Sequence, residues 1–253
     1  MEFDEMLSAL SREGALFATA INAVGVDAPV PTCPEWTVRD LVLHQGEVHR
    51  WAATVVAGAI PKPSAVPDDV VGEVPTDDML ADWLIAGLDG LIRALRAAPA
   101  DLAAFTFLND APPARMFWAR RQLHETEMHR VDAESAAGAF TPFEPASAED
   151  GVDEMLTGFA PRKHTPLHAD GAHTLQIELT DSPRRWRMTI SEEPPRTDRL
   201  AAGDDSGADC TVSGTAADMY RALWNRADGN VLAVRGDRSV LDLFRSSVKI
   251  RWS

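Results

Sequence analysis

The amino-acid sequence predicts two folds in succession, a helical bundle and then a small α+β domain, so that the fold class is α plus α+β. Four long segments with apolar residues at helical spacing occupy the first part of the chain, and prolines fall only between them. After Gly138, shorter segments alternate apolar and polar residues, a pattern typical of antiparallel strands. We therefore expect an N-terminal four-helix bundle over residues 1–145 and a C-terminal α+β domain over residues 146–253.

The helices of the bundle are expected over residues 2–22, 38–57, 76–98 and 115–137. Three prolines within residues 29–34 forbid helix immediately before the second segment. Thr37 can cap that second helix, and Asp40 at the third position after it approximates a capping box. Two connections that contain several prolines, residues 61–75 and 99–113, flank the third helix.

The second domain is expected to begin with a short helix and to continue with three strands. These elements are placed at residues 146–159 for the helix and at 173–180, 186–190 and 208–213 for the strands. Residues 181–183 supply turn chemistry between the first two strands. Thr215 can cap a helix over residues 216–226, and the chain ends with a run at 232–237 and an amphipathic segment from Val240.

Composition excludes several classes of function. The chain has 253 residues with 45% hydrophobic and 25% charged residues, which is typical of a soluble globular protein. Its net charge of −15 leaves no electrostatic footprint for nucleic acid or an anionic membrane. No secretory leader and no apolar run of transmembrane length is expected, and Cys33 and Cys210 are solitary, so we expect a cytoplasmic protein. Both a monomer and a small homo-oligomer fit the sequence.

The most informative stretch is residues 120–132, which reads as the middle of a helix. On such a helix Glu125 and His129 stand one turn apart on the same face, a spacing suited to two metal ligands. A catalytic zinc ion usually takes three protein ligands, and His44 in the second helix is the best candidate for the third. From spacing alone, the bland alternatives stay open: Glu125 and His129 as a surface pair, and His44 as a core histidine.

Three segments carry a resemblance to a known family. Residues 33–44 (CPEWTVRDLVLH) and 124–133 (HETEMHRVDA) resemble the mycothiol-dependent maleylpyruvate isomerase family, which belongs to the DinB-like metal-binding bundles. Residues 212–226 (VSGTAADMYRALWNR) resemble the C-terminal domain of that family, which has a sterol-carrier-like fold. The resemblance implies that three residues bind a divalent metal, with zinc as the expected ion: His44, Glu125 and His129.

The resemblance also implies an activity. The expected protein is an enzyme that activates a low-molecular-weight thiol, mycothiol, for cis–trans isomerisation or S-transfer on a small electrophile such as maleylpyruvate. The expected catalytic set is the three ligands together with Arg226, which would reach the substrate; Arg221 is the second choice. Two alternatives remain, a DinB-like metal-dependent hydrolase with water in the open metal position and a non-catalytic protein that binds a metal or a small ligand.

Roles for the neighbouring residues are expectations of the same kind. Arg121 and His124 are expected to contact the thiol cofactor or the substrate, and Asp132 is expected to orient His129. The remaining candidates are read as structural or solvated: His49, Glu47 and Glu127. The tryptophans Trp36 and Trp51 are read as packing residues.

Overall fold

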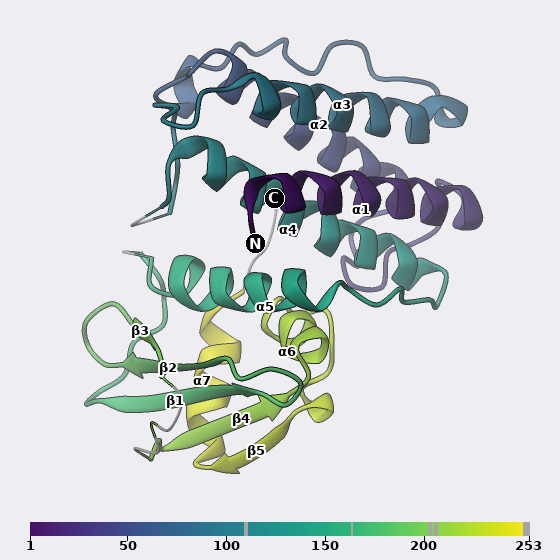
Figure 1. The fold of residues 1–253 in the computed structure, drawn as a ribbon. Helices are drawn as coiled ribbons and strands as arrows, with labels where there is room; N and C mark the ends of the chain where they lie inside the picture. Colours follow the sequence, from purple (N-terminus) through teal and green to yellow (C-terminus); the bar gives the residue numbers. More distant parts are fainter. Residues whose placement is uncertain (109–110, 163, 202–203, 205–206, 250–253) are drawn as a thin grey trace. The chain divides into compact units, whose positions relative to one another are not determined.

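A computed structural model describes the chain except for residues 109–110, 163, 202–203, 205–206 and 250–253 (Figure 1). The chain divides into two compact units. Unit 1 comprises Met1–Phe107 and Ala111–Pro142, and unit 2 comprises Leu108–Asp110 and Phe143–Ser253. The predicted fold class is confirmed, because a helical N-terminal region is followed by a unit with a mixed five-stranded sheet. A border at residue 145 stays a prediction.

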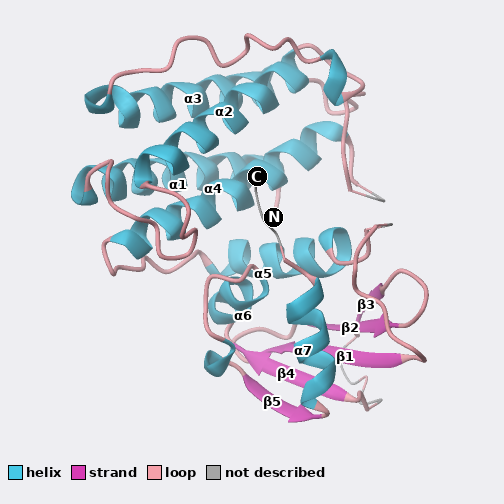
Figure 2. Cartoon of the chain, turned by 180° about the vertical axis from the view of Figure 1, so that it is seen from behind, coloured by secondary structure: helices cyan, strands magenta, loops and turns pink. Residues whose placement is uncertain are grey.

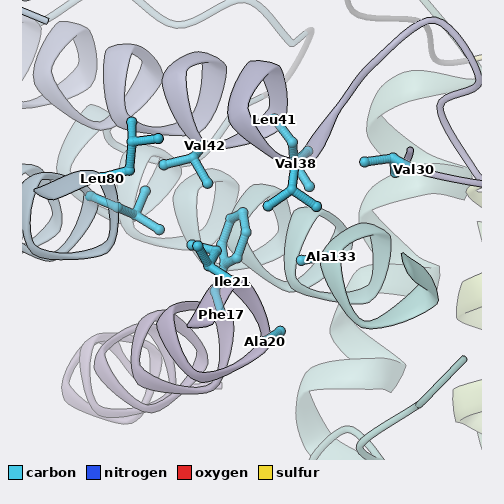
Figure 3. Close-up of a cluster of buried hydrophobic side chains, with 10 residues drawn as sticks. Phe17, Ala20, Ile21, Val30, Val38, Leu41, Val42, Leu80 and Ala133 are labelled. Carbon is cyan, nitrogen blue, oxygen red and sulfur yellow. The ribbon is translucent and has the colours of Figure 1, made fainter. Parts of the chain in front are cut away.

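Unit 1 contains four long helices within a few residues of their expected positions (Figure 1). They are α1 (Phe3–Val24), α2 (Val38–Ala57), α3 (Leu80–Ala97) and α4 (Ala114–Ala136). Their apolar side chains meet in one cluster, shown in Figure 3, to which the loop before α2 adds Val30. Ten residues form the buried cluster: Phe17, Ala20, Ile21, Val30, Val38, Leu41, Val42, Leu80, Leu84 and Ala133. No helix in the described parts of the chain is long and apolar enough to cross a membrane.

Helix α4 differs from the other three because it is buried on every side. All residues from Arg121 to Glu134 are buried, although many of them are charged. A buried charge is tolerated only when other groups pair with it or solvate it. The polar side chains of α4 are therefore committed to specific partners inside the protein.

One such set of partners lies between α1 and α4. Arg130 places Nε 2.7 Å from Oε2 of Glu13 and donates from Nη1 to Oε2 of Glu134 at 2.6 Å. Burial raises the pKa of Glu13 to about 7; the positive charges of Arg130 and Arg12 oppose this rise, and the negative charge of Glu127 adds to it. Glu13 therefore takes up a proton near neutral pH although it touches an arginine.

This raised pKa predicts how stability depends on pH. Because the pKa of Glu13 is about 7 in the folded chain against the ordinary value of 4.5 for a glutamate, its contribution to stability is full at low pH and is lost as the pH rises through 7. Linkage makes that loss at most roughly 3 kcal/mol. Glu13→Gln should flatten this fall, which urea-unfolding midpoints between about pH 5 and about pH 8 would measure. An unchanged pH slope in the variant would contradict the assignment.

Unit 2 is built on a five-stranded sheet with the order β3-β2-β1-β4-β5. The strands are β1 (His173–Leu179), β2 (Arg185–Ile190), β3 (Arg196–Arg199), β4 (Cys210–Gly214) and β5 (Ala233–Gly236). All neighbours pair antiparallel except β1 and β4, which are parallel. Edge strand β3 was not predicted, because its four residues are polar and show no apolar alternation.

Helices pack against the sheet of unit 2, and Figure 2 shows α7 (Arg238–Ser247) running across one face of it. The apolar side chains of Leu175, Met188 and Cys210 are paired in register and lie on one face of the sheet. The helix expected at residues 146–159 is α5 (Pro145–Glu154), and it passes into a single π-helical stretch at Met155–Phe159. Helix α6 (Ala216–Leu223) is capped by Thr215 as expected.

Candidate metal centre

The position of His44 is set by the loop that precedes α2. Within this loop the backbone N–H of Val30 donates to the carbonyl of Trp36, and that of Val38 donates to the carbonyl of Ala28. Thr37 and Asp40 then form a complete capping box, so α2 starts at a defined residue. A fixed start determines the direction in which every later side chain leaves the helix, and that of His44 leaves toward α4.

The structure brings together three donor atoms from α2 and α4. His44, Glu125 and His129 each offer one atom, and these atoms lie within 4.8 Å of one another. Oε1 of Glu125 is 3.4 Å from Nε2 of His129 and 3.8 Å from Nε2 of His44. Within the described residues no other group of three His, Cys, Asp or Glu side chains meets the same criterion.

The donor group fits a tetrahedral cation. Zinc holds nitrogen and oxygen ligands at about 2.0–2.1 Å, which places tetrahedral ligands about 3.3–3.4 Å apart. The two measured separations match or slightly exceed that value. Oε1 of Glu125 and Nε2 of His129 are buried, and neither has a hydrogen-bond partner among the described residues. Two imidazoles and one carboxylate are also a ligand set that catalytic zinc uses.

Glu125 is held in the ionised form that a ligand needs. Its second oxygen, Oε2, accepts a hydrogen bond of 3.0 Å from Nη2 of Arg121, one turn earlier on α4. Burial disfavours its charge, but the neighbouring imidazoles of His129 and His44 and the positive charge of Arg121 outweigh that effect and lower the pKa of Glu125. Arg121, which the sequence predicted to contact the thiol cofactor or the substrate, is 1% exposed and donates to the carboxylate oxygen that faces away from the two histidines.

His129 is oriented by Asp132. Nδ1 of His129 lies 2.9 Å from Oδ2 of Asp132, and because a carboxylate can only accept, Nδ1 carries a proton, so that in the neutral ring Nε2 has the lone pair for a cation. Burial opposes protonation, but the hydrogen bond to Asp132 and the nearby carboxylate of Glu125 raise the pKa of His129 overall. A cation that binds here must therefore displace a proton from His129.

The loop before α2 contributes residues that spacing did not reveal. Thr32 donates from Oγ1 to Oδ1 of Asp132 at 2.6 Å, which fixes the carboxylate that orients His129. The ring of Trp36 lies 5.0 Å from that of His44 and 6.2 Å from that of His129, measured between centroids. Trp36 thus packs against both imidazoles. The motif at residues 33–44 contained this tryptophan, but nothing local to Thr32 pointed to a residue 100 positions away.

The other residues named from the sequence lie outside the donor group. Nδ1 of His124 is 3.0 Å from Oε2 of Glu127 and both side chains are fully buried, because His124 leaves α4 on a different side from Glu125. His49 is fully buried against Thr126, and burial lowers its pKa to about 3. Arg226 belongs to unit 2, where it is 8% exposed and donates to the carbonyl of Trp224 at 2.9 Å.

The fold and the donor group define a class of protein, a four-helix bundle with a two-histidine, one-glutamate centre between facing helices, followed by an α+β unit. The model of the mycothiol maleylpyruvate isomerase N-terminal domain matches residues 7–134, and the model of the C-terminal domain of the same enzyme matches residues 146–243. The chain therefore belongs to the mycothiol maleylpyruvate isomerase family, as the sequence motifs predicted, and hence to a family named for an isomerase.

Solved structures support the same fold. The crystal structure of the mycothiol-dependent maleylpyruvate isomerase is 15% identical, with a TM-score of 0.62 over 92% of this chain and 93% of that chain. The structure of a histidine-to-alanine mutant of that enzyme gives a TM-score of 0.61 at the same identity and coverage. At this identity the likeness shows the fold alone. No curated protein matches the sequence.

Proposed function

We propose that this chain is a metal-dependent enzyme that activates a low-molecular-weight thiol, of the mycothiol class, for isomerisation of or transfer to a small electrophile. The single observation that carries the proposal is the donor group of His44, Glu125 and His129, whose atoms lie within 4.8 Å of one another. Membership of the family supplies the thiol and the reaction class, with maleylpyruvate as the named example of an electrophile. The cytoplasm, where low-molecular-weight thiols stay reduced, is the proposed location.

Zinc bound by these residues would lower the pKa of a coordinated thiol and so supply a nucleophilic sulfur near neutral pH. The residues of the chain set the conditions for this chemistry. Glu125 and the two imidazoles would hold the ion with three ligands and leave one position for the thiol. Asp132 fixes His129 with Nε2 available, and Arg121 keeps Glu125 ionised.

Residues of the chain are also proposed to contact the substrate and the thiol. Arg226 is assigned to the carboxylate of the substrate through the family resemblance, because a guanidinium can hold a carboxylate with two hydrogen bonds. Among the residues expected to contact the thiol, the geometry supports Arg121 more than His124. Arg121 touches a proposed ligand directly, whereas His124 is fully buried against Glu127.

A cobalt-substituted protein would test the function. Co²⁺ in a tetrahedral site absorbs visible light, and a sulfur that enters its coordination sphere changes that spectrum. We expect mycothiol, or cysteinyl-glucosamine as its simpler relative, to shift the spectrum, and serine, which lacks the thiol, to leave it unchanged. A protein that binds cobalt but does not respond to thiols would support water as the fourth ligand and a hydrolase. A folded protein that binds no metal would leave only a non-catalytic role.

A further inference from the structure

The donor group lies at one point along the line where α2 and α4 face each other, which we call the seam. Seven residues after His44, α2 carries Trp51, and seven residues before Glu125, α4 carries Trp118. Seven residues turn an α-helix through nearly two full turns, so each tryptophan lies on the same face as the ligand of its helix. The two rings are 5.5 Å apart between centroids, so these faces meet again about 10 Å along the seam.

Three further aromatic rings extend the pair of tryptophans. Phe105 and Phe107, in the segment before α4, and Phe117 on α4 all lie edge-on to one of their neighbours at centroid distances of 5.1–6.4 Å. The indole N–H of Trp118 donates to the carbonyl of Phe105 at 2.8 Å, which ties the segment to the helix. Phe107 is nevertheless 36% exposed and Trp51 is only half-buried.

The inner part of the same seam is closed, and its outer part is accessible. On the inner side, Nε2 of His49 lies 2.8 Å from Nε2 of Gln45 and 2.9 Å from Oγ1 of Thr126, and all three side chains are fully buried. On the outer side, the α2 residues His44 and Trp51 are both partly exposed. One proposed ligand, His44, and the ring of Trp51 are therefore both partly accessible on one face of α2, while Glu125 and His129 lie buried behind His44. We call this face of α2, with the neighbouring ring of Phe107, the accessible edge.

We propose that this edge is a binding site for a planar, apolar group of the electrophile, such as an aryl ring, held against Trp51 and Phe107 while the reacting end lies at His44 and Glu125. The inference rests on the proposed function and specifies its substrate class. A molecule bound at the metal and extended along the seam reaches the rings, and ring stacking adds to the gain from apolar burial. In this proposal Trp51, which the sequence suggested to be only a packing residue, selects the substrate.

A matched pair of carboxylates tests the proposal. Cinnamate and crotonate share a carboxylate and a trans double bond and differ in a phenyl ring against a methyl group. We expect the zinc-loaded protein to bind cinnamate about tenfold more tightly by calorimetry, from burial of the ring. Trp51→Leu should remove most of that preference and leave crotonate binding unchanged, and Trp51→Phe should restore part of it. Saturation-transfer NMR should show contact to the phenyl protons in the wild type alone.

Trp83→Leu is the control, because Trp83 is also a half-buried tryptophan of unit 1 but stacks on Arg50. It should keep the cinnamate preference. Equal preference in wild type and Trp51→Leu would overturn the aryl site, and so would a Trp51→Leu protein that loses zinc or loses both carboxylates equally. The cobalt titration distinguishes failure of the proposed function from failure of the aryl site. If the cobalt protein responds to thiol but Trp51→Leu keeps the cinnamate preference, only the aryl site is overturned.

Discussion

His44→Ala is expected to lower the zinc affinity of the chain by at least about 100-fold. Zinc sites with four protein ligands are stabilised by roughly 10–16 kcal/mol, so one ligand accounts for about 3 kcal/mol, which is a factor of about 100. The fold should survive, because the side chain of His44 is 23% exposed and makes no contribution to the buried apolar cluster. Equilibrium dialysis with elemental analysis measures the change directly.

His168→Ala is the matched control, because His168 is an exposed histidine of unit 2. It should bind one equivalent of zinc like the wild type. If His44→Ala also retains a full equivalent at the same affinity, the three-ligand centre is wrong, and with it the activation of a thiol at this position. Glu125→Gln is a poorer probe, because it would also leave Arg121 buried beside a neutral group.

Gly46→Ala is expected to destabilise unit 1 by about 1–3 kcal/mol, because it overpacks the contact between α2 and α3. A Cβ at this position would lie 2.0 Å from Cζ3 of Trp83 and within 2.7 Å of two further ring atoms. Trp83 cannot yield easily, because its other face is stacked on Arg50, whose Nη2 donates to the carbonyl of Trp83. Since Gly46 is two residues from His44, zinc affinity should fall as well.

Gly90→Ala on α3 provides the comparison at a helical glycine with space around it. The nearest atom to its added Cβ is Nη2 of Arg93 at 3.8 Å, an ordinary contact. This variant should be as stable as the wild type or more stable by about 0.5–1 kcal/mol, because alanine favours helix over glycine. Denaturant unfolding of both variants checks the pair, and equal stabilities would show that Trp83 moves aside at little cost.

The helical part of the fold was predictable because its signals are local. Apolar spacing, prolines in the connections and the Thr37–Asp40 cap place each helix to within a few residues of its observed bounds. The same reasoning failed for β3, since its residues Arg196–Arg199 are held by pairing with β2 and not by any pattern of their own. It also gave no sign that helix changes to π-helix at Met155.

The candidate site also has a part that the sequence predicted and a part that it left open. The placement of Glu125 and His129 on one face follows from 3.6 residues per turn, so the sequence by itself determined that pair. His44 was the best candidate for the third ligand, and the resemblance implied the same residue. Helix geometry alone left it open, because the distance between two helices depends on how both pack on the rest of unit 1.

Only the tertiary structure decided what surrounds the pair. It buried every residue of α4 from Arg121 to Glu134, so that the contacts of Arg121 with Glu125 and of His124 with Glu127, which helix spacing permits, are buried pairs. It also brought Thr32 to Asp132 across 100 residues of chain. The physical reason is that a hydrogen bond within a helix is set by local geometry, whereas burial and contacts between distant segments depend on the packing of the whole unit.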